Sequence, residues 1–337
     1  MPGTLRRQWW RGTRPPWEDG AVSEHPSLDV IIPAAGAAAL IGVAVDAVRA
    51  QDYPALRSVI VASSDDATSE TARRHGAEIV PNPTGRTPTG LNLALAAGTS
   101  EIVARVDAHA IIPEGYLTRA VETLVASGAD NVGGMQVPVG RTGWERVIAA
   151  AMASPFGAGD ARHRVGGVAG PAETVYLGVF KRSTIERLGG FDETFERNQD
   201  YELNHRIRAS GGVVWFDPEL RVTYQPRSSL GALASQYFQY GQWKREFARR
   251  YSRSLRWRQM APPVLVIAIA ASIVVGIWWP PTWVIPAGYL AILLAVGLTH
   301  IPRLGVAAFG IPLALGTMHF SWGLGFLTGR PKRGRRT

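Results

Sequence analysis

The fold is decided by residues 105–110, RVDAHA, which follow the apolar run 101–104, EIVA. A short β-branched run that ends in Asp-x-His predicts a buried strand whose carboxyl end presents two side chains able to bind a metal ion. Residues two apart in an extended chain point to the same side, so Asp107 and His109 could contact one divalent cation. The alternative is that Asp107 caps a turn and His109 lies on the surface.

Before this stretch, strand patterns alternate with helix patterns along the chain. This order predicts right-handed crossovers and a mainly parallel sheet, and therefore a Rossmann-like α/β fold. The predicted strands are 28–36, 57–66, 77–83 and 101–110, and the predicted helices are 37–51, 68–76 and 87–99.

Polar residues gather where these strands end, and parallel strands end on the same rim of a sheet. Asp65 suits the donors of a base or ribose, while Arg86 and a cation suit the charge of a diphosphate. Asp65 or Asp66 could instead cap the following helix. The chain has no GxGxxG or GxxxxGK[ST] motif, which argues against dinucleotide and P-loop sites.

The composition points to a soluble part joined to a membrane region. The 337 residues carry 36 Lys and Arg against 27 Asp and Glu, and 46% are hydrophobic, enough for one large or two ordinary domains. Charged side chains nearly vanish after residue 262, until the basic run 332–336. The absence of cysteine excludes disulfides and thiolate metal ligands.

Three apolar stretches, 262–279, 283–299 and 304–329, each approach the roughly 20 residues that span hydrocarbon. We predict a membrane region at 261–329 with two or three spanning helices; buried core helices are the alternative. Arginines before residue 262 place the preceding domain in the cytoplasm. Three crossings would export the basic tail, 330–337, against the positive-inside rule, unless one stretch lies in the interface or re-enters.

Two further segments are rich in arginine and aromatic residues. Residues 1–27 have no apolar run after their first arginines, so they are not expected to be a signal peptide. They form either an interfacial anchor or a disordered arm. Residues 231–260 predict an amphipathic helix at the membrane interface.

An ordered series of motifs resembles family 2 glycosyltransferases of the GT-A fold, in the membrane-attached branch of succinoglycan-type glucosyltransferases. The resemblance covers roughly residues 28–250 and places the GT-A domain at 28–230. The motifs are VIIPAAG at 30–36, SSDD at 63–66, NPTGRTPTGLN at 82–92, RVDAHA at 105–110, GGFDETFERNQDYELNHRIRASGG at 189–212 and QYFQYGQWKR at 236–245.

The resemblance implies an inverting transfer of sugar from a nucleotide sugar. It implies a metal motif on Asp107 and His109, with His109 standing where relatives carry Asp, which favours Mn²⁺ over Mg²⁺. It implies recognition of uracil by Asp65 and a catalytic base at Asp200, beside Gln199 where an acidic residue is usual. Nucleotide-sugar binding then falls to Pro33, Asp65, Arg86 and Asp107, although residues 35–37 lack the polar side chains that many relatives have there.

The same resemblance places a QxxRW-type element on Gln239, Gln242 and Trp243, with Gln242 in place of Arg. It implies amide contacts to the diphosphate and an indole wall for the acceptor. The Arg-to-Gln change weakens the phosphate contact.

Asp200 and Arg164 can also be read from their surroundings. Residues 198–210 predict a helix with Leu203 and Ile207 on its core side. Asp200 in its first turn could be the base or a carboxylate favoured by the helix dipole. Arg164 lies in the glycine-rich segment 157–180, either a loop that closes over the phosphates of donor or lipid acceptor, or a solvated surface loop.

We therefore predict a membrane-bound, metal-dependent inverting glycosyltransferase with a cytoplasmic GT-A domain. The expected partners are a UDP-sugar, Mn²⁺ or Mg²⁺, and a lipid-linked saccharide of a cell-envelope polymer or exopolysaccharide. A polyprenyl-monophosphate sugar synthase and a non-catalytic membrane scaffold are the alternatives. Nucleic acid is not an expected partner, because the arginines cluster at membrane flanks.

Overall fold

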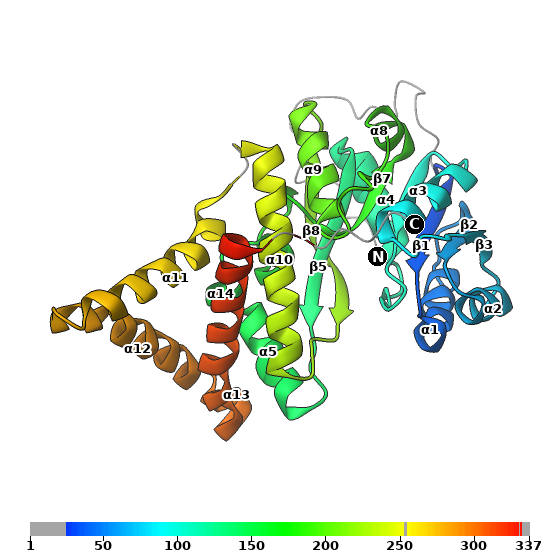
Figure 1. Ribbon diagram of the computed structural model, residues 1–337. Helices are drawn as coiled ribbons and strands as arrows, with labels where there is room; N and C mark the ends of the chain where they lie inside the picture. The colour runs from blue at the N-terminus through cyan, green and yellow to red at the C-terminus, as the bar shows by residue number, and fades with distance from the viewer. Residues whose placement is uncertain (1–24, 253–254, 330, 332–337) are drawn as a thin grey trace.

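The computed structural model describes residues 25–252, 255–329 and 331 (Figure 1). Most of the predicted arm 1–27 and tail 330–337 lies outside these residues. The described chain forms an eight-stranded sheet in the order β3-β2-β1-β4-β7-β5-β8-β6, covered by helices, with three long apolar helices at the C-terminal end.

The first half of the sheet is parallel, as the alternating patterns predicted. β1 pairs with β2 and β4, and β2 pairs with β3, all in parallel. Its strands are β1 Leu28–Ala34, β2 Leu56–Ser63, β3 Glu78–Pro81 and β4 Ile102–Arg105, and its helices are α1 Ala38–Arg49, α2 Asp66–Arg74 and α3 Thr87–Ala97.

The predicted strand 101–110 was too long. β4 ends at Arg105, and the backbone N–H of Ala110 donates to the carbonyl of Asp107 at 2.8 Å, which closes a turn. Asp107 and His109 therefore lie in a turn beyond the strand end instead of alternating along an extended chain.

The second half of the sheet is mixed. β7 is inserted antiparallel between β4 and β5, whereas β5 and β8 are parallel. Its strands are β5 Asn131–Pro138, β6 Gly170–Pro171, β7 Tyr176–Lys181 and β8 Val214–Tyr224; its helices are α4 Tyr116–Ser127, α5 Gly143–Ala153, α6 Pro155–Ala158, α7 Arg162–Val165, α8 Arg182–Arg187 and α9 Gln199–Ala209.

Apolar side chains cover both faces of the sheet. One cluster joins β1 and β4 to α1 and α4, and the other joins β1 and β2 to α3 and α9. Burial of strands on both faces explains their continuous apolar runs. A buried carboxylate is satisfied where β1 begins: Asp29 accepts from Arg182 at 2.9 Å and from the backbone N–H of Ser100 at 2.8 Å.

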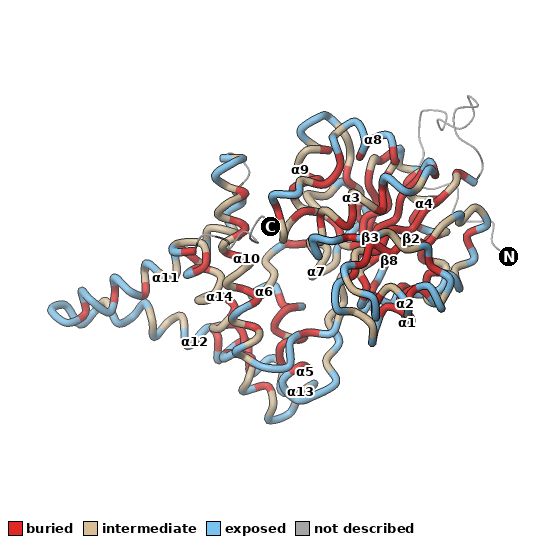
Figure 2. Tube along the Cα trace, turned by 45° about the vertical axis from the view of Figure 1, so that its right-hand side comes forward, coloured by how far each residue is buried: buried red, intermediate tan, exposed pale blue. Residues whose placement is uncertain are grey.

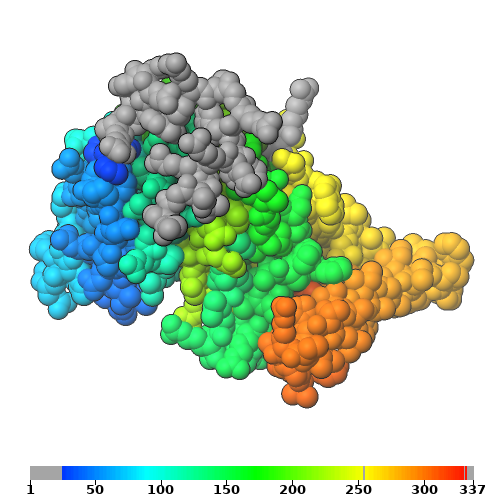
Figure 3. Space-filling view, turned by 180° about the vertical axis from the view of Figure 1, so that it is seen from behind, coloured from blue at the N-terminus to red at the C-terminus, as the bar shows by residue number. Residues whose placement is uncertain are grey.

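The C-terminal segments differ in how far they are covered. Three of them are long and apolar enough to cross a membrane: Trp257–Val275, Pro280–Thr299 and Ile301–Thr328. The first two project from the body as an arm whose surface is largely exposed (Figures 2 and 3). The elements are α10 Leu230–Arg250, α11 Trp257–Val275, η3 Pro280–Trp283, α12 Val284–Thr299, α13 Ile301–Leu304, η4 Gly305–Phe309 and α14 Gly310–Thr328.

The last helix, α14, lies along α10 instead of beside the projecting arm alone (Figure 1). The two backbones touch at glycines: a Cβ added at Gly241 would lie 2.1 Å from the carbonyl oxygen of Trp322, and one at Gly325 would lie 2.1 Å from that of Phe238. The segment predicted as one interfacial helix, 231–260, is thus divided between α10, which packs against α14, and the start of α11.

Candidate active site

A cavity of about 1270 Å³, here called the central cavity, opens beside the carboxyl ends of the parallel strands. Its lining includes Asp107, His109 and Asp200 at the sheet, and Tyr289 and Trp322 on the apolar helices α12 and α14. One space therefore connects the chemically active rim to the segments able to enter a membrane. Such continuity suits a substrate with a polar head and an apolar tail.

Arg105 joins the two carboxylates of the rim. Its Nη2 lies 2.8 Å from Oδ1 of Asp107, and its Nη1 donates to Oδ1 of Asp200 on α9. The guanidinium side chain is only 7% exposed, whereas the Asp200 side chain is 38% exposed and lines the cavity. No role was predicted for Arg105, although a basic residue in an apolar strand is a signal that the sequence contains.

Asp107 is ionised in this setting. Burial raises its pKa, but the nearby charges of Arg105 and His109 outweigh burial and hold the pKa below its usual value. The hydrogen bonds from Arg105 fall on Oδ1. A charged carboxylate beside an imidazole, both lining the central cavity, is a donor pair suited to a divalent cation.

In the part of the chain that the structure describes, no group of three His, Cys, Asp or Glu side chains could hold a metal ion. Asp107 and His109 are two side chains able to bind a metal ion, and a cation held by them would need its remaining ligands from substrate phosphates and water, as is usual for Mg²⁺-type sites.

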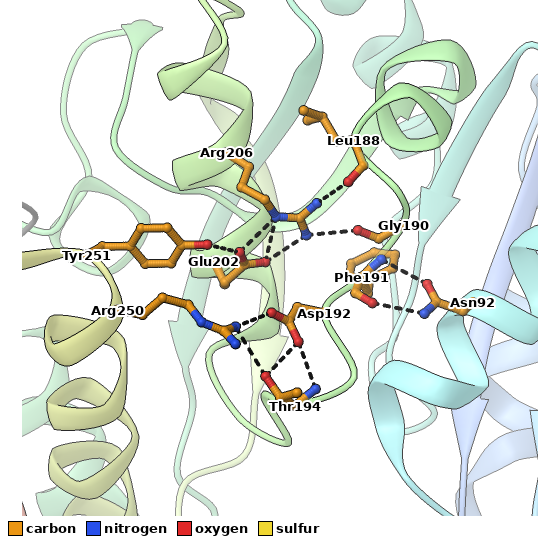
Figure 4. A network of polar contacts seen from close by, with 10 residues as sticks. All are labelled: Asn92, Leu188, Gly190, Phe191, Asp192, Thr194, Glu202, Arg206, Arg250 and Tyr251. Carbon is orange, nitrogen blue, oxygen red and sulfur yellow. Dashed lines mark hydrogen bonds and ion pairs between the residues drawn. The ribbon is translucent and has the colours of Figure 1, made fainter.

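Helix α9, which carries Asp200, is fixed from behind by a polar network (Figure 4). Fully buried Glu202 accepts from Arg206 at 2.7 Å and from the Tyr251 hydroxyl at 2.7 Å. Arg206 also donates to the carbonyls of Leu188 and Gly190, at 2.6 and 2.8 Å. The predicted core side of this helix is confirmed, because Leu203 and Ile207 are fully buried.

Asp65 caps helix α2, which was the alternative to nucleotide binding. Its Oδ1 accepts from the N–H of Thr68 at 2.9 Å and caps α2, while its Oδ2 accepts from the N–H of Gly36 at 2.8 Å. These backbone donors, Gly36 first, lower its pKa. Asp65 does not line the central cavity, but it holds Gly36, which does, as does Pro33.

Arg86 also lies behind the lining. Its Nη2 donates to the carbonyl of Glu193 at 2.6 Å, and its Nε lies 3.2 Å from Oε1 of Glu196. It therefore ties the segment before α3 to the segment before α9. Glu196 lines the central cavity, whereas Arg86 itself does not.

Helix α10 presents a different face to the cavity from the one suggested by its motif. Gln239 accepts from Arg197 at 2.8 Å, and Trp243 is buried with its ring centroid 6.0 Å from that of Phe195. Neither these residues nor Gln242 line the cavity. The residues of α10 that do are Gln236, Tyr237, Tyr240 and Lys244. Their spacing marks one helical face, which the i, i+4 rule could have identified.

Arg164 lies in the short helix α7 and lines the central cavity, as its predicted role requires. Its guanidinium interacts electrostatically with the phenol groups of Tyr237, Tyr240 and Tyr224. Neighbouring His163 also lines the cavity; burial, followed by Arg164 and Arg258, lowers its pKa to about 3, so it is neutral.

A mainly parallel α/β sheet with antiparallel strands in its second half, and carboxylates at the rim of that sheet, are typical of the GT-A class of sugar transferases. Residues 25–240 match the family model described as "Glycosyltransferase like family 2". The succinoglycan biosynthesis protein ExoA of Rhizobium meliloti is 30% identical over 316 residues, which cover 88% of this chain and 93% of that protein. This chain therefore belongs to glycosyltransferase family 2.

Two other relatives extend the comparison. An uncharacterized glycosyltransferase of Mycobacterium tuberculosis is 30% identical over 171 residues, 50% of this chain and 73% of that protein. The mannosyltransferase PcManGT of Pyrobaculum calidifontis, solved with GDP-Man and Mn²⁺, superposes with a TM-score of 0.61 over 90% of this chain and 89% of that one, at 22% identity. This last likeness supports the GT-A fold.

Proposed function

We propose that this glycosyltransferase moves a sugar, with inversion, from a uridine-diphosphate sugar to a lipid-linked saccharide in exopolysaccharide or cell-envelope biosynthesis. The observation that carries the proposal is the central cavity, which runs from Asp107 and Asp200 to the apolar helices α11, α12 and α14. A lipid-linked acceptor could bring its saccharide to the rim while its chain stays among apolar segments. The relationship to ExoA supports the same class of product.

Donor binding falls to the rim. Asp107 and His109 would hold Mn²⁺, or Mg²⁺ in its place, and the ion supplies positive charge that stabilises the departing diphosphate. Mn²⁺ in the mannosyltransferase PcManGT supports this assignment. Pro33 and the loop held by Asp65 would shape the nucleotide side, and Arg86 would fix the loop that leads to α9.

Asp200 would act as the general base. The acceptor hydroxyl oxygen attacks the anomeric carbon as the bond to the nucleoside diphosphate breaks, and the hydroxyl proton passes to Asp200. Arg105 positions Asp200 relative to Asp107, and therefore the base relative to the leaving group. Attack from the face opposite the diphosphate would give inversion.

The acceptor side would be formed by Arg164 with Tyr237 and Tyr240. Gln239, Gln242 and Trp243 would support it from the far side of α10, with Trp243 as a packing residue. The enzyme would be a multi-pass membrane protein whose catalytic domain faces the cytoplasm.

The test uses purified protein in detergent with Mn²⁺, a panel of nucleotide sugars and a membrane lipid extract. Release of nucleoside diphosphate should require both metal and lipid and should disappear in Asp200→Asn, while nucleotide binding persists. Transfer to bare polyprenyl phosphate would identify a polyprenyl-monophosphate sugar synthase instead. No release and no nucleotide binding would indicate a non-catalytic scaffold.

A further inference from the structure

Lys244 is a buried cation on the cavity face of α10. It is only 5% exposed, it lines the central cavity, and its Nζ lies 3.4 Å from the ring centroid of Tyr201 and 4.6 Å from that of Phe247. Within residues 25–252 and 255–329, no carboxylate lies within ion-pair distance of Nζ. Aromatic faces stabilise a cation less than an anion does, so the site has capacity for a negative charge.

The charged groups around Lys244 compensate its positive charge only in part. Glu173, before β7, is the nearby carboxylate, but it already contacts Arg258 of α11 and the hydroxyl of Tyr201, and lies 3.6 Å from Arg256. Arg208 and His205 of α9 and Arg258 of α11 also face Lys244, and the two arginines add positive charge.

Arg164, on helix α7, is a second cation that lines the central cavity. It projects from α7 among the phenols of Tyr224, Tyr237 and Tyr240, and no ion pair joins it to a carboxylate in the described chain. By contrast, Asp107 and Asp200 at the rim are already bridged by Arg105. Two cations without carboxylate partners, from two elements, therefore line one cavity.

We propose that Lys244 and Arg164 together bind the phosphate or diphosphate group of the lipid-linked acceptor. This inference rests on the proposed function and extends it to a named binding site. Lys244 lies on the face of α10 that lines the central cavity, whereas Gln242, two residues earlier, does not. Tyr201, whose ring lies beneath Nζ, directly follows Asp200, and both residues line the same cavity as Lys244.

The site should respond to pH. Burial, opposed by Glu173 and reinforced by Arg258 and Arg208, lowers the pKa of Lys244 to about 7. A lysine is charged below its pKa, so the anion should bind well below pH 7 and more weakly as the pH rises through 7. Arginine at this position would stay charged over the whole range.

The experiment measures binding of a short prenyl diphosphate to the full-length protein in detergent by calorimetry, without donor, and the KM values of donor and lipid acceptor. Lys244→Met should weaken prenyl diphosphate binding and raise the acceptor KM about 10- to 100-fold, the usual cost of losing a charged hydrogen bond. The donor KM should not change. Arg164→Met should act in the same direction. Arg249→Met, at an exposed position of the same helix, is the matched control and should bind as the wild type.

Lys244→Arg provides the second measurement, because it retains the charge even if Lys244→Met folds poorly. It should bind prenyl diphosphate and lose the weakening above pH 7. A raised donor KM in Lys244→Met would assign the anion to the donor diphosphate and overturn the proposal. The same pH profile in Lys244→Arg as in the wild type would also overturn it. Binding of prenyl diphosphate without any sugar transfer would retain the site and reject the proposed function alone.

Discussion

A single guanidinium, that of Arg105, determines how the two carboxylates at the rim lie relative to each other. Arg105 lies at the end of β4. It contacts Asp107, two residues later, and Asp200 at the start of α9, 95 residues later in the sequence. Because the side chain is buried, water cannot take over its contacts at low cost. The relative position of the two carboxylates therefore depends in part on this one residue.

Replacing Arg105 with methionine should lower kcat about 100-fold or more, because the two carboxylates lose their shared counter-charge and their fixed separation. Lysine should restore only part of the rate, since an ammonium lacks the planar fork that contacts both partners. The measurement is steady-state release of nucleoside diphosphate. Arg119→Met, which breaks a pair with Asp217 outside the cavity, is the control and should keep its kcat. Equal rates in both variants would contradict the bridging role.

Asp65 separates capping from loop positioning. Asp65→Ala removes both hydrogen bonds and should cost about 1 kcal/mol of stability through the lost cap. Asp65→Ser can still cap α2 but is too short to reach Gly36 as well. We expect a lower thermal midpoint, followed by circular dichroism, only in Asp65→Ala, and a higher donor KM in both variants. A wild-type donor KM in Asp65→Ser would show that the contact to Gly36 is dispensable.

Local sequence patterns predicted several residues that the fold brings to the central cavity, while their roles remain predictions. Asp107 and His109 follow the parallel strand β4, and they line one cavity with Asp200, which lies in the first turn of α9. The role of Arg105 and Lys244 could not be read in this way, since each depends on partners brought together only by folding. A buried basic residue has no periodic signature of its own.

At the scale of elements, two faces of helix α10 make different contacts. One face lines the central cavity, and another packs against α14 so closely that only glycine fits at the crossing. The motif predicted that Gln239, Gln242 and Trp243 contact the substrate, but none of them lines the central cavity. A motif gives the spacing of residues along the chain and does not show which face of the helix points to the cavity. The antiparallel insertion of β7 was similarly invisible, since pairing between distant strands leaves no local pattern.

Gly241→Ala and Gly325→Ala should each destabilise the protein, because the new methyl group would overlap a backbone carbonyl that cannot move aside. Gly231→Ala, near the start of the same helix, meets open space and should be neutral or stabilising, since alanine favours helix by about 1 kcal/mol over glycine. Thermal midpoints in one detergent compare the three variants. A loss of stability in Gly231→Ala equal to that in Gly241→Ala would refute the close-packing explanation.

At the scale of the whole molecule, the position of α14 bears on how the chain meets the bilayer. This helix is apolar enough to cross, yet it contacts the GT-A domain at both ends: Gly310 lies beside Val147 of α5, and Arg245 of α10 donates to the carbonyl of Leu327 at 2.9 Å. Because α14 packs against α5 and α10, it should stay on the side of the membrane where these two helices lie. We therefore expect α11 and α12 to cross and α14 to lie at the interface.

This arrangement predicts that the residues before α11 and after α14 face the same side of the membrane. Since the chain has no cysteine, single cysteines can be placed at Ser252, Ile277 and Pro331 and labelled with an impermeant maleimide. Ser252→Cys and Pro331→Cys should react from the same side and Ile277→Cys, between α11 and α12, from the other. Labelling of Pro331→Cys with Ile277→Cys would mean three crossings.

Glu173 links α11 to α9, the helix that carries Asp200. It contacts Tyr201, the neighbour of Asp200, and Arg258, in the first turns of the helix expected to enter the lipid. A membrane too thin or too thick for α11 would tilt that helix, and the tilt would reach the catalytic helix through one carboxylate. The composition of the surrounding lipid would then act on turnover without any lipid entering the cavity, and Glu173→Gln would leave the enzyme less responsive to acyl-chain length.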